Sequence, residues 1–364
     1  MTAIAQITEL ARSMLSDSKR NLEVDKAISD AVDLVYEEGF PTHNWDETHI
    51  RKQVQRSLTG YGSLEEILED SAIEEIWINR PGQVFIHKNS QTSILPLDLD
   101  ALAVRQTVEK MLRDSGRRLD RSEPFVDATL FDGSRLHVVI PDVTKNHWAV
   151  NIRRFPESIR KLADLVAANA LTYGTAEFIK AEFQSGSNIL VSGATQAGKT
   201  TILCALLEES HPQDRLISIE ETFEVRTNHP DWVALQTRQA NLEGVGEISL
   251  RRLVREALRM RPTRLVIGEV RQAEALDLLI ALNSGIAGIC TIHANSAIDA
   301  IEKLKLLPLL AGENIPAKFV SKTVERNIDI VVHAQVDRFG HRRISEVLVA
   351  NRSNHKTKWE ERTL

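Results

Sequence analysis

The apolar residues of the N-terminal part of the chain recur every three or four positions. Polar residues lie between them, and the pattern is interrupted only from Ser16 to Asn21. This spacing is typical of amphipathic helices, so residues 1–57 are predicted to form a helical segment. Whether this segment packs on the rest of the protein or docks on a membrane partner stays open. The positions that carry the pattern are Ile4, Ile7, Ala11, Met14, Leu15, Ala27, Ile28, Val32, Leu34 and Val35.

Between residues 58 and 154, short apolar runs alternate with turn residues. One stretch has helical spacing, from Leu102 to Leu112, and it is expected to end near Gly116. Asp132-Gly133 lies between two apolar runs and is a strong hairpin signal. We therefore predict an independent α+β domain over residues 58–154. Its predicted strands are 76–78, 84–87, 125–130, 135–140 and 148–152.

Residues 155–174 are expected to form a linker, because they begin with the sequence Phe155-Pro156-Glu157-Ser158. From residue 175 to 364, strand-like and helix-like runs alternate. That alternation predicts an α/β domain with a mostly parallel sheet covered by helices. The predicted strands are 189–192, 216–219, 265–267 and 289–292, the helices are 203–207, 250–260, 273–282 and 297–307, and a closing hairpin joins 328–334 to 343–349.

The composition narrows the class of protein. Hydrophobic residues are 42%, charged residues 26% and the net charge is −6, which is typical of soluble globular domains. The acidic balance and the aromatic content of 5% argue against nucleic acid as a partner. With no signal peptide at the N-terminus and no run of 18 apolar residues, we expect a cytoplasmic protein for which any membrane association would be peripheral. Cys204 and Cys290 lie far apart, so neither a disulfide nor a cysteine zinc site is expected.

One motif carries a specific chemistry. It follows the predicted strand 189–192, and it opens a helix-like run that begins with Thr201. The pattern G-x-x-x-x-G-K-[ST] in this setting is a phosphate loop, although an ordinary glycine-rich turn is the alternative. Backbone N–H groups and the helix N-terminus would hold the phosphates of ATP, with Lys199 at the β- and γ-phosphates and the Thr200 hydroxyl on Mg²⁺. The residues of the motif are Gly193, Ala194, Thr195, Gln196, Ala197, Gly198, Lys199 and Thr200.

Three further polar groups follow predicted strands of the same sheet. They are Glu220, Glu269 and His293. Ligands bind at the carboxyl ends of strands in an open parallel sheet, so these side chains are expected to lie beside the phosphate loop. An NTPase needs carboxylates to orient water and to hold hydrated Mg²⁺. Glu220 and Glu269 are therefore candidate catalytic residues, with Glu269 and Thr200 as metal ligands and His293 as a sensor of the γ-phosphate, although each residue taken alone could be structural.

Together these blocks resemble the Walker A, Asp box, Walker B and His box of the secretion-superfamily ATPases. That superfamily serves type II and type IV secretion, type IV pili and Tad/Flp pili. The resemblance covers residue 58 to the end and is closest to the Tad/Flp pilus assembly ATPases (CpaF-like). Further blocks that carry it are 60–65, 132–136, 241–244, 253–262, 268–271, 291–296 and 307–314.

The resemblance implies a fold and an assembly. Members are homohexamers in which an N-terminal domain precedes a RecA-like P-loop NTPase domain, with the nucleotide in the cleft between them. Arginines of the N-terminal domain point at the phosphates, and Arg135 and Arg153 match those positions. Arg117, Arg118 and Arg154 lie close to the same motifs.

The chain also departs from the family. Gln196-Ala197 replaces the usual Gly-Ser, Glu221 stands where Asp is usual, and Thr263 replaces an Asp. Ile286 stands where the family often has the first His of the His box. The four-cysteine zinc element of the type II secretion and type IV pilus extension ATPases is absent from the sequence, which disfavours those branches.

The sequence thus predicts a hexameric motor that hydrolyses ATP with Mg²⁺. It would power a Tad/Flp pilus or a protein secretion machine, with inner-membrane platform proteins as partners. Three alternatives stay open: a conjugation or type IV secretion ATPase, a RecA-like nucleic-acid motor, and a non-catalytic nucleotide-gated scaffold. The last is motivated by Gln196, Thr263 and Ile286.

Overall fold

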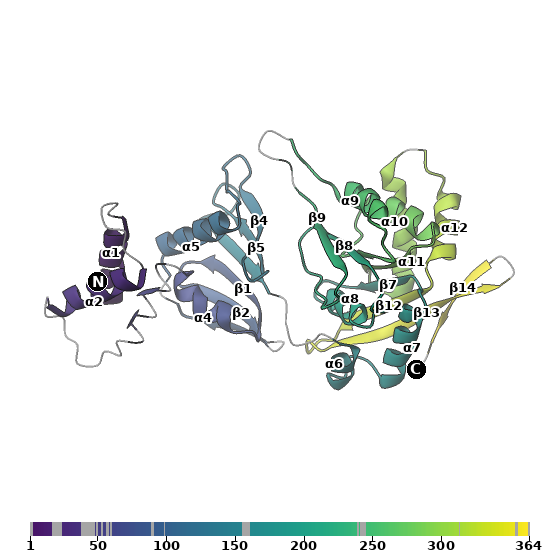
Figure 1. Cartoon of the computed structure of the whole chain (residues 1–364), viewed down its shortest axis with the longest axis horizontal. Coiled ribbons are helices and arrows are strands. Elements are labelled where there is room, and N and C mark those ends of the chain that lie inside the picture. Colours follow the sequence, from purple (N-terminus) through teal and green to yellow (C-terminus); the bar gives the residue numbers. More distant parts are fainter. Residues whose placement is uncertain are drawn as a thin grey trace. The chain divides into compact units, whose positions relative to one another are not determined.

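The computed structural model divides the chain into two compact units, Met1–Pro156 and Glu157–Leu364. They are drawn in Figure 1, and each is described by itself. The boundary lies within the residues where a linker was expected. The structure describes residues 3–16, 24–37, 48, 50–51, 54–55, 58, 60–88, 91–97, 99–154, 161–238, 240, 245–312, 314–353 and 356–362.

The first unit begins with two amphipathic helices, α1 (Ala3–Ser16) and α2 (Val24–Glu37). Their apolar faces form a small core of their own. Apolar residues at helical spacing therefore produce the helices that the sequence predicts. The expected helical content of residues 38–47 lies outside the described residues. The buried members of this core are Ile7, Ala11, Ile28, Ala31, Val32, Val35, Ile50 and Val54.

The rest of the first unit is a six-stranded antiparallel sheet in the order β3-β2-β1-β6-β5-β4. One stripe of helix α5 (Ala101–Asp114) packs on it through Val104, Val108 and Met111. The short helices η1 (Gly62–Leu64) and α4 (Glu65–Glu69) precede it. The strands are β1 Ile73–Arg80, β2 Gln83–Lys88, β3 Gln91–Leu95, β4 Phe125–Thr129, β5 Arg135–Val139 and β6 Ala149–Arg153.

The second unit is an eight-stranded sheet in the order β14-β13-β12-β7-β11-β10-β8-β9. The six strands from β12 to β9 are parallel, while β13 and β14 are antiparallel additions at one edge. The strands are β7 Ile189–Gly193, β8 Leu216–Glu220, β9 Trp232–Gln236, β10 Arg264–Ile267, β11 Ala287–His293, β12 Ile330–Val336, β13 Arg342–Ser353 and β14 Lys356–Glu361.

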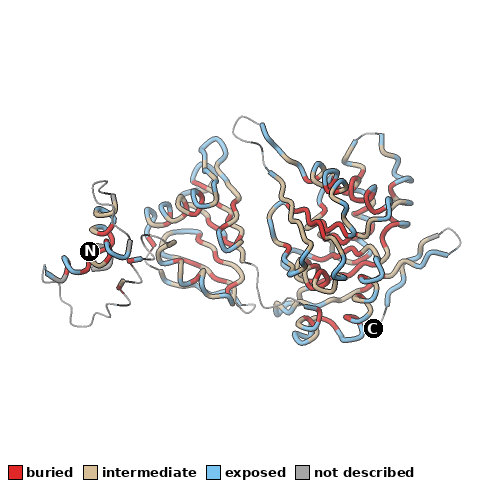
Figure 2. The backbone as a smooth tube through the Cα atoms, in the orientation of Figure 1, coloured by how far each residue is buried: buried red, intermediate tan, exposed pale blue. Residues whose placement is uncertain are grey.

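Two helical layers cover this sheet, and the central strands between them are buried (Figure 2). One face packs against α9 (Leu250–Ala257), which continues as η2 (Leu258–Met260), and against α10 to α12. The other face packs against α6, α7 and α8. The remaining helices are α6 Leu162–Ala167, α7 Tyr173–Gln184, α8 Lys199–Leu207, α10 Glu274–Asn283, α11 Ala297–Leu306, η3 Leu307–Ala311 and α12 Ala317–Asn327.

The structure differs from the expected linker over residues 155–174. Within this range the described residues 161–174 hold helix α6 and the start of α7. Leu162 and Leu165, one helical turn apart, are buried against the sheet of the second unit together with Leu171. These three leucines explain why the segment packs as part of the second unit.

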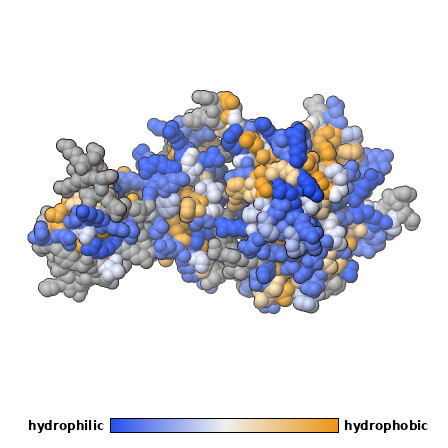
Figure 3. Space-filling view, in the orientation of Figure 1, coloured by the Kyte–Doolittle hydropathy of each residue, from blue (hydrophilic) through white to orange (hydrophobic). Residues whose placement is uncertain are grey.

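The elements that hydrophobic patterning did not predict lie mostly at the edges. Strand β3 is exposed along almost its whole length, and β9 is nowhere fully buried. An edge strand buries too little for an apolar run to mark it. Over the described residues, none of the helices has the length and apolar content that crossing a membrane requires. Hydrophilic side chains cover most of the face seen in Figure 3.

Candidate active site

The phosphate loop leaves the most central strand of the second unit. Every residue of β7 is buried, because β11 and β12 flank the strand and helices cover both faces. Gly193 ends the strand with φ 154°, and a Cβ there would collide with the carbonyl oxygen of Ala334 on β12. Gly198 has φ 88° and is the N-cap of α8. Both glycines of the motif are therefore required by the backbone.

The middle of the loop has an unusual feature at Gln196. Its φ is 63°, a left-handed conformation that residues with a side chain rarely adopt. Gln196 is exposed together with Ala194 and Thr195, whereas Ala197 is buried. The replacement of the family's usual glycine thus falls at a position where the loop does require positive φ.

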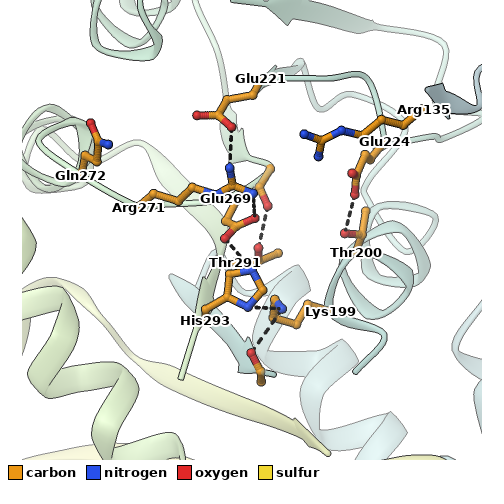
Figure 4. Close-up of polar contacts among 12 residues, drawn as sticks. Arg135, Lys199, Thr200, Glu221, Glu224, Glu269, Arg271, Gln272, Thr291 and His293 are labelled. Carbon is orange, nitrogen blue, oxygen red and sulfur yellow. Dashed lines mark hydrogen bonds and ion pairs between the residues drawn. The ribbon is translucent and has the colours of Figure 1, made fainter. Parts of the chain in front are cut away.

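Lys199 is the first residue of α8 and only 7% exposed. Its ammonium group donates to the carbonyl oxygens of Gly193 at 3.2 Å and Ala194 at 2.8 Å. It also lies 3.1 Å from Nδ1 of His293, at the end of β11 (Figure 4). Thr200 and Thr201 follow in the first turn of the helix. The structure therefore brings Lys199 and His293 together, as the strand-end argument predicts.

His293 connects Lys199 to Glu269. Because an ammonium can only donate, Nδ1 of His293 accepts and its proton is on Nε2, which lies 2.8 Å from Oε1 of Glu269. Burial and the charge of Lys199 lower the pKa of His293. The imidazole is therefore neutral at physiological pH, and its Nε2 lies close to Oε1 of the carboxylate without forming a hydrogen bond there.

Glu269 is held in its ionised form by a residue that the sequence analysis did not single out. Arg271 donates through Nη2 to Oε2 of Glu269 at 2.7 Å and through Nη1 to Oε2 of Glu221 at 2.7 Å. Burial acts to raise the pKa of Glu269, but the hydrogen bond and charge of Arg271, with His293 and Lys199, outweigh it, and the pKa is lowered. A continuous polar chain thus runs from the phosphate loop to the loop after β8 (Figure 4).

Glu220, at the end of β8, is 2% exposed. Its Oε1 accepts the backbone N–H groups of Glu224 at 2.9 Å and Val225 at 2.8 Å, which fixes the loop after the strand. A Cβ at Gly268 would lie 2.8 Å from Cγ of Glu220, so glycine is needed there. Burial raises the pKa of Glu220 to about 7, although the two backbone hydrogen bonds oppose it. The loop it holds brings Glu224 to Thr200, whose hydroxyl donates to Oε2 of Glu224 at 3.4 Å.

The raised pKa of Glu220 predicts a pH dependence of stability. Between its ordinary value of 4.5 and about 7 the folded chain holds a proton that the unfolded chain has lost. The free energy of unfolding therefore falls as pH rises through this window, by at most about 3 kcal/mol. Glu220→Gln keeps an acceptor for the two N–H groups and removes the titration. We expect the variant to gain stability over the wild type from pH 5 to pH 8, measured by denaturant unfolding. Parallel pH profiles would contradict this, and Glu302→Gln, whose side chain is 61% exposed, is the control.

The oxygen donors of the site suit Mg²⁺. Among the described residues no group of three or more His, Cys, Asp or Glu side chains is arranged to hold a metal ion, and Mg²⁺ bound with a nucleotide needs only one or two protein oxygens. The Thr200 hydroxyl lies beside Glu224, and Oε2 of Glu220 is buried without a hydrogen-bond partner. Oε2 of Glu269 is held by Arg271 at 2.7 Å and Oε1 lies 2.8 Å from Nε2 of His293, although Oε1, like Oε2 of Glu220, is buried without a hydrogen-bond partner. Thr200 with Glu224 is thus the group that best fits the metal, while Glu269 fits the role of orienting water.

Comparison with known proteins identifies the family. Residues 57–356 match the family described as type II/IV secretion system protein. The chain belongs to this family. It is 35% identical to a putative conjugal transfer protein of Mycobacterium tuberculosis, over 81% of this chain and 86% of the relative. It is 32% identical to the type IV secretion system protein PtlH of Bordetella pertussis, over 71% of this chain and 84% of the relative.

Solved structures confirm the expected fold. The pilus retraction motor PilT with bound ADP aligns with a TM-score of 0.56 at 19% identity, over 79% of this chain and 83% of that one. The Legionella pneumophila ATPase DotB aligns with a TM-score of 0.56 at 18% identity, over 85% of this chain and 82% of that one. This member of the type II/IV secretion family therefore has a RecA-like α/β domain after a smaller α+β domain and N-terminal helices.

Two of this chain's departures from its family lie far from the phosphate loop. Ile286 precedes β11 and packs on the hydrophobic core. His293 is at the other end of that strand, seven residues or roughly 23 Å away at the rise of an extended chain. Thr263 precedes β10, where its hydroxyl accepts from the backbone of Arg215 at 2.8 Å. Neither residue lies at the end of the sheet where Lys199 and His293 meet.

The two candidate arginines of the first unit lie side by side. Arg135 on β5 pairs in register with Arg153 on β6, so both side chains are on the same face of the sheet. Arg135 lies 3.3 Å from Asp127. Arg154 is the next residue along the chain, so its side chain points to the opposite side of the sheet. It donates to the carbonyl oxygen of Asp70, within the same unit. The register therefore places the two guanidinium-bearing side chains, Arg135 and Arg153, on one face of the sheet.

Proposed function

We propose that this secretion ATPase is a motor subunit that hydrolyses ATP with Mg²⁺ and works as a homohexamer. The observation that supports this best is the polar chain Lys199–His293–Glu269–Arg271–Glu221. It links the residue expected at the γ-phosphate to an ionised carboxylate and then to the loop after β8. A passive nucleotide-binding scaffold has no need of an ionised carboxylate held in this way.

We assign each residue of the site a separate chemical role. The backbone from Gly193 to Thr201 and the ammonium of Lys199 bind the phosphates, and the neutral His293 reports the γ-phosphate to Glu269. The ionised Glu269 accepts a hydrogen bond from the attacking water and orients it. Thr200, with Glu224 beside it, holds Mg²⁺, which when bound neutralises the charge that develops on the phosphates.

Phosphate release by the purified chain tests this function directly. We expect Mg²⁺-dependent turnover of ATP, measured against oligomeric state by mass photometry, and turnover that rises with the hexamer fraction. A chain that binds nucleotide without releasing phosphate in any oligomeric state would instead be the nucleotide-gated scaffold.

We further propose that the motor acts at the cytoplasmic face of a membrane and engages platform proteins of a Tad/Flp-type pilus. The sequence blocks of the C-terminal unit support this branch. A second candidate is a conjugation or type IV secretion ATPase, which the names of relatives at 35% and 32% identity favour. Deletion of the gene separates them: loss of surface pili supports the first, and loss of conjugal transfer or of protein secretion with pili intact supports the second.

The arginines of the first unit are proposed to couple hydrolysis to domain movement. A guanidinium remains charged and offers several donors to phosphate oxygens. We expect Arg153→Ala to lower ATP turnover by about 10³-fold, as loss of an arginine that stabilises the transition state does, with the melting temperature unchanged. Turnover equal to that of Arg121→Ala, a control in the same unit whose side chain is 86% exposed, would exclude this role.

A further inference from the structure

The hairpin formed by β12 and β13 lies next to the phosphate loop. Strand β12 runs parallel to β7 and pairs Ala334 with Gly193, the residue at which the loop begins. It continues to Val336, and the chain returns on β13 at Arg342, which pairs with Val336. This register carries Arg342 past the end of β7 and beside the loop that leaves it.

Arg342 contacts the loop at its unusual residue. Its Nε donates to the carbonyl oxygen of Gln196 at 3.0 Å. Its Cδ lies 3.5 Å from the position that a Cβ at Gly198 would take. The side chain therefore spans the outer side of the loop from residue 196 to residue 198.

The contact is made to the residue of the loop whose backbone is strained, because it has a positive φ and is not glycine. Gln196 has φ 63°, whereas the other positive-φ positions of the loop, Gly193 and Gly198, are glycines. In a trans peptide the C=O and the following N–H point in opposite directions. By holding the oxygen of Gln196, Arg342 keeps the N–H of Ala197 directed at the carbonyl oxygen of Ala194, to which it donates with an N···O distance of 3.3 Å.

The hairpin supports Arg342 rigidly. In the turn between the strands, Oδ1 of Asp337 accepts the N–H of Phe339 at 2.7 Å and that of His341 at 3.0 Å. The same carboxyl group lies 3.1 Å from Nδ1 of His341. Arg342 thus follows a turn whose conformation is fixed by its own hydrogen bonds.

We propose that Arg342 is a positioning residue for nucleotide binding that compensates for the missing glycine at position 196. Its guanidinium holds the Gln196 peptide in the left-handed conformation, so that the loop presents its N–H groups to phosphate. The inference rests on the nucleotide binding proposed above and adds a residue 146 positions away in the chain. If it holds, the need for Arg342 disappears when glycine, which adopts this conformation freely, is restored at position 196.

A double-mutant cycle tests this directly, with the fluorescent nucleotide mant-ADP as the probe. We expect Arg342→Ala to weaken binding about tenfold, the usual effect of losing a hydrogen bond from a charged donor. Gln196→Gly sets the reference for the second half of the cycle, and Arg342→Ala in that background is expected to lose no more than about twofold relative to it. Arg343→Ala, the exposed neighbour on β13, is the matched control.

An equal loss in both backgrounds would overturn the proposal, because Arg342 would then act on the nucleotide or the fold and not through Gln196. Amide hydrogen exchange of the nucleotide-free chain gives a second readout that does not depend on binding. Arg342→Ala should speed exchange in residues 194–198 and leave α10 unchanged, and unchanged exchange in that loop also overturns it. If the wild-type chain binds no mant-ADP but Arg342→Ala still speeds exchange in the loop, the proposed function is contradicted. The role of Arg342 in holding the loop is then still supported.

Discussion

Glu269→Gln is expected to lower ATP turnover about 100-fold or more while nucleotide still binds. The substitution keeps the shape of the side chain and one acceptor oxygen, but it removes the negative charge that Arg271 holds in place. An amide is a very weak base, so it cannot orient and polarise the attacking water as a carboxylate does, and general-base effects are worth about 10²–10⁴-fold. Phosphate release at saturating ATP measures the loss, and mant-ADP titration measures binding.

The same variant has a second, spectroscopic consequence. The charge of Glu269 raises the pKa of His293, although burial and Lys199 lower it more. Removing the carboxylate charge should therefore lower the pKa of His293 further, which an NMR titration of the imidazole can follow. Glu302→Gln, on the exposed side of α11, is the matched control for turnover. If Glu269→Gln turned over ATP at the control rate, Glu269 could not be the catalytic carboxylate.

Much of the architecture could be predicted because the central strands are buried on both faces. Strands β7, β8 and β10 are mostly apolar, and every one of their residues is buried. The predicted hairpin of β12 and β13 is present as well. The edge strands β3, β9 and β14 and helix α12, which buries few apolar side chains, gave no comparable pattern.

The site could be predicted only in part, for a related reason. Lys199, Glu269 and His293 follow buried strands that lie next to one another, so their meeting follows from the order of the sheet. Arg271 and Glu224 lie in loops, and which partner a loop side chain reaches depends on the loop conformation. The roles of Glu220 also depend on that conformation, since its oxygen caps the loop that carries Glu224.

Arg342 is the clearest case of a contact beyond sequence reasoning. Its partner is a backbone carbonyl oxygen, that of Gln196, so the type of side chain at that position does not indicate the contact. In the sequence, position 196 stands out because it lacks the glycine that is usual in the family. The positive φ of Gln196 shows why that replacement matters for the loop.

Lys199→Ala is expected to remove both nucleotide affinity and turnover. Lys199 is only 7% exposed, and its ammonium lies between the loop carbonyls and His293, where the phosphates are expected to bind. Loss of a preorganised cation at a developing negative charge costs about 10²–10³-fold in rate. Turnover by phosphate release and binding of mant-ADP should both fall, while Lys180→Ala, a lysine paired with Glu209 away from the site, leaves both unchanged.

The pKa of His293 in this variant distinguishes loss of the Lys199 charge from loss of the fold. The charge of Lys199 lowers the pKa of His293, so Lys199→Ala should raise that pKa, opposite to the shift expected for Glu269→Gln. A folded variant with the raised pKa and no turnover places Lys199 in the chain that runs from phosphate through His293 to Glu269. An unshifted pKa in a folded variant would mean that Lys199 and His293 do not meet in solution, and the coupling between phosphate and carboxylate would have to pass through another residue.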